Sequence, residues 1–273
     1  MKYKEFEIIL SSFNCNKNCP YCTAKITKWP SVEDNIDKLE ETLLTLKNKG
    51  ICFRYFILSG NGEPSMHSYE KLKKIAEATR NVSIFDEKRI QSSGNIFYEP
   101  EKLEMVKDDF IVEVTRVDFD SAKDMKILGY DKDYIASDNF KKARIRLNYV
   151  MLKNKSVEQY LEEIKRYVNT YPNIETISLK TLNLNTLNGQ TDNKYSQWIL
   201  ENALTKNDAA EVIEKMNKYA RFEWKDERFF DRYEWEYENK PITFYVKKLD
   251  YGLSNIVWYG GKLVNYGLKE IEI

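Results

Sequence analysis

Three of the four cysteines of this 273-residue chain, Cys15, Cys19 and Cys22, lie on one short stretch, CNKNCPYC, and Cys52 stands apart. A C-x3-C-x2-C loop carries three thiolate donors and can wrap around an object a few ångströms across, so it can ligate three corners of a cubane iron–sulfur cluster. The fourth iron would then have no protein ligand. Such an open position accepts a substrate or cofactor that chelates through N and O atoms, as catalytic zinc sites do.

Two other uses of these cysteines stay open. A zinc loop would need a fourth Cys or His ligand at a defined spacing. The only histidine, His67, is expected to pack or cap at a helix start, and Cys52 to be a small buried residue at the start of a strand. A thiol redox pair of Cys19 and Cys22 would leave Cys15 unexplained. Four cysteines in a chain of this length are too few for a disulfide-rich scaffold.

Strand-like and helix-like segments alternate over roughly the first two thirds of the chain. Runs of β-branched and aromatic residues predict the strands, and apolar residues at helical spacing predict the helices. Strands that alternate with helices form parallel sheets through crossover connections, which predicts an α/β fold, here a partial (β/α)6 TIM-like barrel. The predicted strands span 6–10, 51–58, 89–92, 110–119, 144–151 and 174–182, and the predicted helices 32–49, 69–79, 100–107, 121–128, 133–142 and 157–171.

This alternation ends after the sixth predicted strand, where a polar linker begins. One or two helices are expected over 195–219 and strands over 242–246 and 255–259. We therefore predict two parts, a barrel core over 1–190 and a C-terminal α+β extension over 191–273. The extension is rich in aromatic residues with acids between them, and those acids would repel phosphates. Its aromatic residues are expected to pack in the core or to form a substrate lid.

Glycine and polar residues follow the predicted strands at the edge where α/β barrels place their sites. After the second strand, in the turn SGNGEP, Gly60 and Gly62 let the backbone come close to a ligand, and Glu63 offers a carboxylate to an ammonium group. A glycine-rich turn by itself is weak evidence. At the end of the strand that follows a C-x3-C-x2-C loop, however, it predicts a shared ligand site.

The cysteine run, with the aromatic Tyr21 before its last cysteine, resembles the signature of the radical S-adenosylmethionine (radical SAM) superfamily, CxxxCxxC type. The resemblance covers about residues 5–185. The turn after the second strand is similar to the family's GGE-type motif, which holds the methionyl amino group. By this resemblance the metal ligands are Cys15, Cys19 and Cys22, and the cofactor-binding residues are Tyr21, Gly60, Asn61, Gly62, Glu63, Ser92, Ser93, Asp118, Arg146, Asn148 and Leu179.

The later residues of that set resemble particular family positions. Asp118 stands where Ser is common in the family. Ser92 and Ser93 are similar to a turn near the cofactor, Asp118 to a contact with the ribose hydroxyls, Arg146 and Asn148 to polar positions for ribose or carboxylate, and Leu179 to an apolar residue packed on adenine.

The resemblance implies an enzyme with one [4Fe–4S] cluster and S-adenosylmethionine as cofactors. An electron from a flavodoxin- or ferredoxin-type partner would cleave the sulfonium, and the 5′-deoxyadenosyl radical would abstract a hydrogen from substrate. The chain has no further cysteines for an auxiliary-cluster (SPASM/twitch) domain. A peptide or protein residue is the expected substrate, and a nucleotide or other small metabolite or cofactor precursor is the alternative. A non-catalytic zinc or thiol redox protein is a more distant alternative.

Charge and hydropathy exclude several classes of protein. Lys and Arg number 43 and Asp and Glu also number 43, so there is no net charge. Nucleic acid is therefore not the expected substrate, because proteins that grip its backbone carry a basic excess. No stretch approaches the roughly 18 to 20 apolar residues of a membrane span, and the N-terminus has no signal-peptide apolar block. We expect a cytoplasmic protein.

Overall fold

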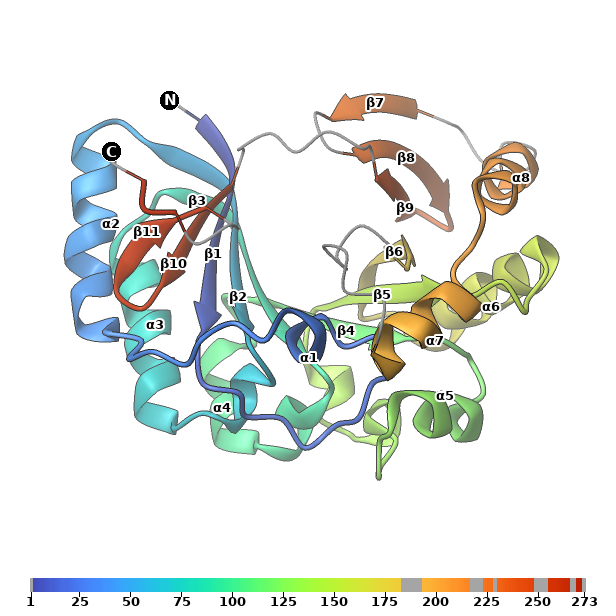
Figure 1. The fold of residues 1–273 in the computed structure, drawn as a ribbon, viewed down its shortest axis with the longest axis horizontal. Coiled ribbons are helices and arrows are strands. Elements are labelled where there is room, and N and C mark those ends of the chain that lie inside the picture. Colours follow the sequence, from blue (N-terminus) through green and yellow to red (C-terminus); the bar gives the residue numbers. More distant parts are fainter. Residues whose placement is uncertain are drawn as a thin grey trace.

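The alternating segments build one curved sheet with helices on its outside (Figure 1). The structure is a computed structural model that describes residues 2–182, 193–216, 223–227, 230–247, 255–265 and 269–271. Within these residues the sheet has 11 strands in the order β11-β10-β1-β2-β3-β4-β5-β6-β9-β8-β7. The strands are β1 (Lys2–Leu10), β2 (Cys52–Gly60), β3 (Phe85–Ser92), β4 (Ile111–Arg116), β5 (Ile145–Met151), β6 (Ile174–Thr181), β7 (Glu223–Glu227), β8 (Phe230–Tyr237), β9 (Lys240–Lys247), β10 (Asn255–Tyr259) and β11 (Lys262–Val264).

Helices connect most of the parallel strands. Several begin at a side-chain cap; α6, for example, starts with a reciprocal capping box between Ser156 and Gln159. In the part of the chain described, no helix is long and apolar enough to cross a membrane. The α-helices are α1 (Thr23–Thr27), α2 (Leu39–Asn48), α3 (Tyr69–Asn81), α4 (Pro100–Val106), α5 (Ser121–Leu128), α6 (Val157–Thr170), α7 (Lys194–Asn202) and α8 (Lys206–Met216).

The sheet is a partial barrel that does not close. β10, β1 to β6 and β9 pair in parallel, whereas β11 and the β8–β7 pair are antiparallel additions at the two ends. The two end strands, β11 and β7, do not pair with each other. The predicted α/β class and the partial TIM-like barrel are therefore confirmed.

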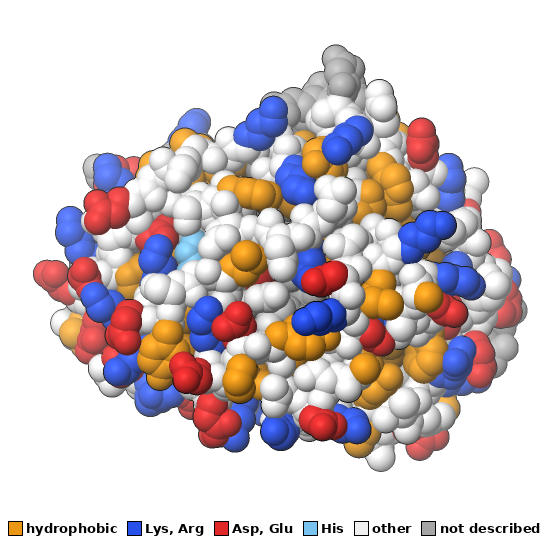
Figure 2. Space-filling view, turned by 90° about the horizontal axis from the view of Figure 1, so that it is seen from below, with side chains coloured by type: hydrophobic (Ala, Val, Ile, Leu, Met, Phe, Trp, Pro, Cys, Tyr) orange, Lys and Arg blue, Asp and Glu red, His pale blue; other side chains and the backbone are white. Residues whose placement is uncertain are grey.

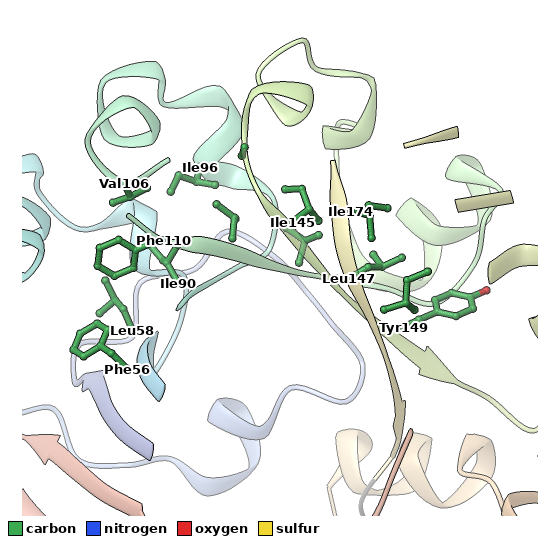
Figure 3. Packing of buried hydrophobic residues seen from close by; sticks show 14 of the residues in the cluster. Phe56, Leu58, Ile90, Ile96, Val106, Phe110, Ile145, Leu147, Tyr149 and Ile174 are labelled. Atoms are coloured by element: carbon green, nitrogen blue, oxygen red, sulfur yellow. The ribbon is translucent and has the colours of Figure 1, made fainter. Parts of the chain in front are cut away.

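The outer face of the strands is apolar and packs against the helices. Phe56 on β2, Ile90 on β3 and Leu147 on β5 are fully buried and point into this layer (Figure 3). Tyr149 on β5 packs edge-on against Tyr160 of α6, with ring centroids 5.7 Å apart. Because side chains alternate along a strand, the neighbouring residues must point into the barrel.

The inner face of the same strands carries charged and amide side chains. Register pairs Gln91 of β3 with Glu113 of β4, and Glu113 with Arg146 of β5. Asn148 follows Arg146 on the same face. Gln91 is exposed although β3 lies inside the sheet. Solvent therefore reaches the interior, and the barrel is lined by polar groups instead of being filled by apolar ones.

The predicted extension is continuous with the barrel sheet at both edges. β9 pairs with β6, where Ile177 is the register partner of Ile242, and β10 pairs with β1, where Ile8 is the partner of Trp258. Trp235 and Trp258 are at most 2 % exposed and belong to the main core. The boundary near residue 190 stays a prediction, but these aromatic residues pack in the core.

Some predicted strand boundaries were wrong. β3 begins at Phe85, four residues earlier than predicted, because Asp86, Glu87 and Lys88 make the first half of the strand polar on both faces. β1 starts at Lys2 and not at residue 6. The strands β7, β8 and β11 were not predicted at all.

Two predicted helices were also wrong in part. The helix expected from residue 32 begins only with a 3-10 turn at Ile36, because Asn35 takes a left-handed conformation with φ of 47°. Residues 133–142 form two separate 3-10 turns, Tyr134–Ala136 and Phe140–Lys142, and not one helix. The short helix α1 that follows the last cysteine was not predicted.

Adjacent leucines on α2 test the packing of this helix on the sheet. Leu43 is fully buried and Leu44 is 43 % exposed. Leu43→Ala should lower the free energy of unfolding by about 2 to 5 kcal/mol, because it leaves a cavity. Leu44→Ala should change it by no more than about 0.5 kcal/mol. Chemical denaturation of both variants checks this, and equal losses would contradict the assigned faces.

Candidate functional site

The cysteine loop leaves β1 at the carboxyl edge of the sheet and ends by turning into α1. The backbone amide of Cys22 donates to the carbonyl of Cys19 at 3.3 Å, and the carbonyl of Cys22 accepts from the amides of Lys25 and Ile26 at 3.2 Å each. Cys22 is thus the N-cap residue of α1. Two of the three thiols are therefore held by one tight turn and the helix that follows it.

Local contacts position the other side of the loop. The Cys15 sulfur accepts from the backbone amide of Lys17 at 3.4 Å, and the Cys19 thiol lies 3.5 Å from the carbonyl of Leu128 at the end of α5. The ammonium of Lys17 is buried and pairs with Asp131 at 3.1 Å. The loop is held against the end of α5 as well as against β1.

The three thiols lie close enough to influence one another electrostatically. Burial, then Cys22 and Cys15, raise the pKa of Cys19 to about 12, and burial is also the main cause of the raised pKa of Cys15. No group of three or more His, Cys, Asp or Glu that could hold a single metal ion occurs in the described residues. A cubane cluster is larger and needs thiolates spread around it. The donor set fits such a cluster in number and chemistry, since metal binding deprotonates thiols outright.

The glycine-rich turn after β2 is bound tightly to the cysteine loop. The amide of Glu63 donates to the carbonyl of Asn14 at 2.8 Å, and the Asn14 side chain donates to the carbonyl of Met66 at 2.8 Å. A Cβ on Gly62 would lie 2.5 Å from the Asn14 carbonyl oxygen, which real contacts do not allow. Only glycine fits this position, and the residue before Cys15 is thereby fixed.

Asn61 braces the loop from the same turn. Its side chain is buried and donates to the carbonyl of Ser11, before the cysteines, at 3.2 Å and to that of Trp29, after α1, at 3.3 Å. Its own amide donates to the carbonyl of Leu10 at 2.8 Å. Asn61 therefore holds both ends of the cysteine loop. Gly60, by contrast, has ordinary space around it, since a Cβ added there would lie 3.5 Å from the nearest atom.

Glu63 joins the turn after β2 to the turn after β3. Its carboxylate, 1 % exposed, accepts from the amide and hydroxyl of Ser65, from the hydroxyl of Ser92 at 2.9 Å and from the amide of Ser93. The Ser93 hydroxyl is buried and has no partner among the described residues. The structure thus brings Glu63, Ser92 and Ser93 together beside the cysteine loop, while their contact with a cofactor stays a prediction.

Tyr21 connects the cysteine loop to the C-terminal part of the chain. Its ring lies 5.7 Å from that of Trp198 on α7, and Ile26 of α1 packs in a small cluster with Ile199 of the same helix. The Tyr21 hydroxyl is buried without a partner in the part of the chain described. Burial raises the pKa of this hydroxyl well above its usual value. α7 therefore covers one side of the loop, as Figure 1 also shows.

Asp118 follows β4 and is engaged in an ion pair. Its carboxylate lies 2.8 Å from the ammonium of Lys155, which is also 2.8 Å from Glu163 of α6. It also accepts from the amide of Asp120 at 2.9 Å, and Asp120 in turn caps the start of α5. Burial raises the pKa of Glu163 to about 7, and Asp118 adds to that effect.

Arg146 and Asn148 lie on the inner face of β5, around the buried carboxylate of Glu113. Arg146 and Arg89 approach one oxygen of Glu113 at 3.2 Å each, and Asn148 and Gln91 approach the other at 3.4 and 3.3 Å. Burial would raise the pKa of Glu113, but Arg146 and then Arg89 outweigh it and the pKa is lowered. A charged network therefore crosses the barrel interior.

Leu179 is not brought to this interior. It is fully buried and pairs in register with Tyr149, which faces α6. The inner positions of β6 are those on either side of it, Ser178 and Lys180. The structure thus places Leu179 in the layer between sheet and helices, away from the other predicted cofactor residues.

His67 and Cys52 lie outside the cysteine loop. His67 is 5 % exposed and ends a 3-10 turn just before the N-cap Ser68 of α3, in agreement with the predicted packing role. Its pKa is lowered, chiefly by burial and then by Lys71. Cys52 is half-buried at the start of β2 and packs against the core.

Several residues of the site could not be recognised from the sequence. Asn14 is separated from Gly62 by 48 positions, and nothing in its local sequence marks a backbone contact. Trp198 belongs to an amphipathic helix whose apolar face could have met any surface. Lys155, however, lies four residues after the end of β5, and its position after a strand end was a signal that pointed to the site edge.

Comparisons with known proteins support the fold. The solved structure of native anSMEcpe with bound AdoMet and the Kp18Cys peptide matches 79 % of this chain and 59 % of its own, with a TM-score of 0.52 and 16 % identity. A histidine-tagged form of anSMEcpe with bound AdoMet matches 66 % and 51 %, with a TM-score of 0.50 and 18 % identity. No protein-family model matches the chain, and no curated protein matches it.

anSMEcpe is an anaerobic sulfatase-maturating enzyme of the radical SAM superfamily. The fold of this chain therefore matches that of the radical SAM superfamily, as the resemblance in sequence predicted. The matched region spans 51 % to 59 % of the length of these two solved structures. At these identities the likeness concerns the fold alone.

The face that carries the cysteine loop has no dominant charge. Figure 2 looks at the molecule from below the view of Figure 1 and shows Lys and Arg side chains intermixed with Asp and Glu. A single-sign patch, which a nucleic acid would require, does not stand out on this face.

The two glycines of the turn provide a matched test of its contact with the cysteine loop. Gly62→Ala should lower the free energy of unfolding by about 1 to 3 kcal/mol, because its Cβ must displace the Asn14 backbone. Gly60→Ala should cause little loss, because its Cβ meets only ordinary contacts. Thermal unfolding of both variants measures this. A Gly62→Ala protein as stable as the Gly60→Ala protein would show that the contact is not tight.

Proposed function

We propose that this chain is a radical SAM enzyme in which Cys15, Cys19 and Cys22 hold one [4Fe–4S] cluster. The observation that carries the proposal is the bracing of a three-thiol loop against the glycine-rich turn, through Asn61 and the Asn14–Gly62 contact, at the carboxyl edge of a parallel partial barrel. A loop fixed in this way presents three donors without a fourth. When bound, such a cluster would supply the electron that cleaves S-adenosylmethionine to the 5′-deoxyadenosyl radical.

The residues around the loop have separate tasks in this proposal. The backbone of Gly60 to Gly62 and the carboxylate of Glu63 would receive the methionyl end of S-adenosylmethionine. Glu63 is already fixed by Ser92 and Ser93, so its remaining acceptor capacity is oriented before the cofactor binds. Tyr21 and the α7 residue Trp198 would exclude water from one side of the loop. A flavodoxin- or ferredoxin-type protein would be the reductant.

A peptide or protein residue is the proposed substrate. The matched structure of anSMEcpe with the higher coverage contains the Kp18Cys peptide, and the fold shared with that protein supports the same class here. An open barrel with a polar interior can admit a side chain from outside. A nucleotide or other small metabolite is the second candidate, supported by the charged side chains that line the interior.

Anaerobic reconstitution with iron and sulfide tests the cluster. The wild-type protein should become brown, lose its colour on reduction with dithionite, and release 5′-deoxyadenosine from S-adenosylmethionine. Cys19→Ala should lose both colour and cleavage, because a ligand is removed. Cys52→Ala is the matched control and should retain both, since Cys52 lies at the start of β2, away from the loop.

Other outcomes would contradict the proposal. A colourless protein that holds one zinc ion and never cleaves S-adenosylmethionine would support the zinc alternative. Equal iron content in Cys19→Ala and wild-type protein would mean that the loop does not hold the cluster. For the substrate, transfer of deuterium from a labelled peptide into 5′-deoxyadenosine distinguishes a peptide from a metabolite.

A further inference from the structure

Arg146 is mostly buried, and its guanidinium forms no hydrogen bond with the described residues. The side chain is 6 % exposed, and its Nε is buried without a hydrogen-bond partner, although it forms an ion pair with Glu113 at 3.2 Å. A guanidinium has five N–H donors. A buried N–H donor left without an acceptor costs free energy, which an acceptor on a ligand can offset. The neighbouring Arg89 differs, because it bonds to both Glu87 and Glu113 and stacks on Tyr55.

Two further orphaned polar groups lie beside Arg146 on the inner face. Asn148 is the next inward residue on β5, and its Oδ1 is buried without a donor among the described residues. Ser178 of β6 is its register partner, fully buried, and its hydroxyl also has no partner there. Unpaired buried groups are rare in native proteins. Three such groups on adjacent positions of adjacent strands indicate a site for a ligand.

The chemistry of these groups defines the ligand. The free end of Arg146 matches a carboxylate, which can accept two parallel hydrogen bonds. A phosphate dianion fits less well, because Glu113 and Glu87 lie in the same network. Asn148 Oδ1 can only accept, so the ligand must also carry an N–H or O–H donor, and the Ser178 hydroxyl can bond to either kind of group.

We propose that the barrel interior contains a substrate site in which Arg146 binds a carboxylate, and Asn148 and Ser178 bind an adjacent amide or hydroxyl group. An acidic side chain or the C-terminus of a peptide, or a small amino or hydroxy acid, has this chemistry. The inference rests on the proposed function and narrows its substrate to an anionic one.

The carboxylate of S-adenosylmethionine does not fit this position. In the proposed function the methionyl end, which carries that carboxylate, lies at the glycine-rich turn after β2, against the cysteine loop that follows the carboxyl end of β1. Arg146 is the second residue of β5 and lies five residues before the carboxyl end of that strand, or about 16 Å along it. β5 is also four strands away from β1 in the sheet. Arg146 therefore belongs to the substrate, and its predicted contact with the cofactor is replaced by this assignment.

Thermal unfolding of the whole chain with small probes tests the site without any turnover. N-acetylglycine carries a carboxylate next to an amide N–H, acetate carries only the carboxylate, and N-acetylglycinamide is neutral. At millimolar concentration and constant ionic strength, N-acetylglycine should raise the melting temperature by about 2 to 5 °C. Acetate should raise it less, and N-acetylglycinamide should have no effect.

Variants connect the shift to the named residues. Arg146→Lys keeps the charge beside Glu113 but loses the planar pair of donors, so the N-acetylglycine shift should disappear. Arg144→Lys, an exposed arginine on the same chain segment, is the matched control and should keep the shift. Ser178→Ala removes an unpaired hydroxyl, so it should fold normally and show a reduced shift. That variant keeps the test valid if Arg146→Lys does not fold.

Three results would overturn the proposal. The first is an equal shift with N-acetylglycinamide, and the second is an unchanged shift in both Arg146→Lys and Ser178→Ala. The third is loss of the shift when saturating S-adenosylmethionine is added to the reconstituted protein, since the carboxylate site would then belong to the cofactor. If the wild-type protein does not bind iron on reconstitution but still shows the melting-temperature shift with N-acetylglycine, the radical SAM function is contradicted and the carboxylate site is still supported.

Discussion

The close contact between the cysteine loop and the glycine-rich turn is the constraint on which the candidate site depends. Gly62 leaves no room for a side chain against the Asn14 backbone, and the Glu63 amide donates to the carbonyl of Asn14. Cys15 is the next residue, so the first thiol is fixed by the turn after β2. Glu63 extends the same contact to Ser93 after β3. Three strand ends are thus bound together before any ligand is present.

This constraint explains which parts of the site the sequence could predict. The cysteine spacing and the glycine-rich turn are local patterns, and both follow apolar strands that are easily recognised. The cysteines, the turn from Gly60 to Glu63, and Ser92 and Ser93 could therefore be predicted to lie at one edge. The structure brings them together, and their contact with a cofactor stays a prediction. The contact of Tyr21 with Trp198 could not be predicted, because it joins segments 177 positions apart. Leu179 was assigned to the cofactor site only because it lies on β6. The alternation of side chains along that strand, however, places it on the face that packs against the helices.

The polar side chains of β3 explain one of the errors in the fold. Strand prediction relies on an apolar face, and β3 has none before Ile90, because Asp86 and Lys88 occupy the same face as Ile90 and the other face is also polar. The place of the C-terminal strands in the sheet was hidden for another reason. β9 and β10 were predicted as strands, but their partners β6 and β1 lie far away in sequence, so no local pattern could reveal that the extension continues the barrel.

The same polar interior carries information about function that the fold alone does not. An apolar interior would stabilise a barrel better than arginines and glutamates, because burying charges costs more than their pairing returns in many proteins. Arg89 and Glu113 offset much of that cost by bonding to each other, whereas Arg146 only forms an ion pair with Glu113 and leaves its buried Nε without a hydrogen bond. Gln91, on the inner face of β3, is exposed to solvent, so the charge of Arg146 on the same inner face lies near a space that solvent can enter. A side chain that weakens the free protein in this way is best explained by the ligand that completes its hydrogen bonds.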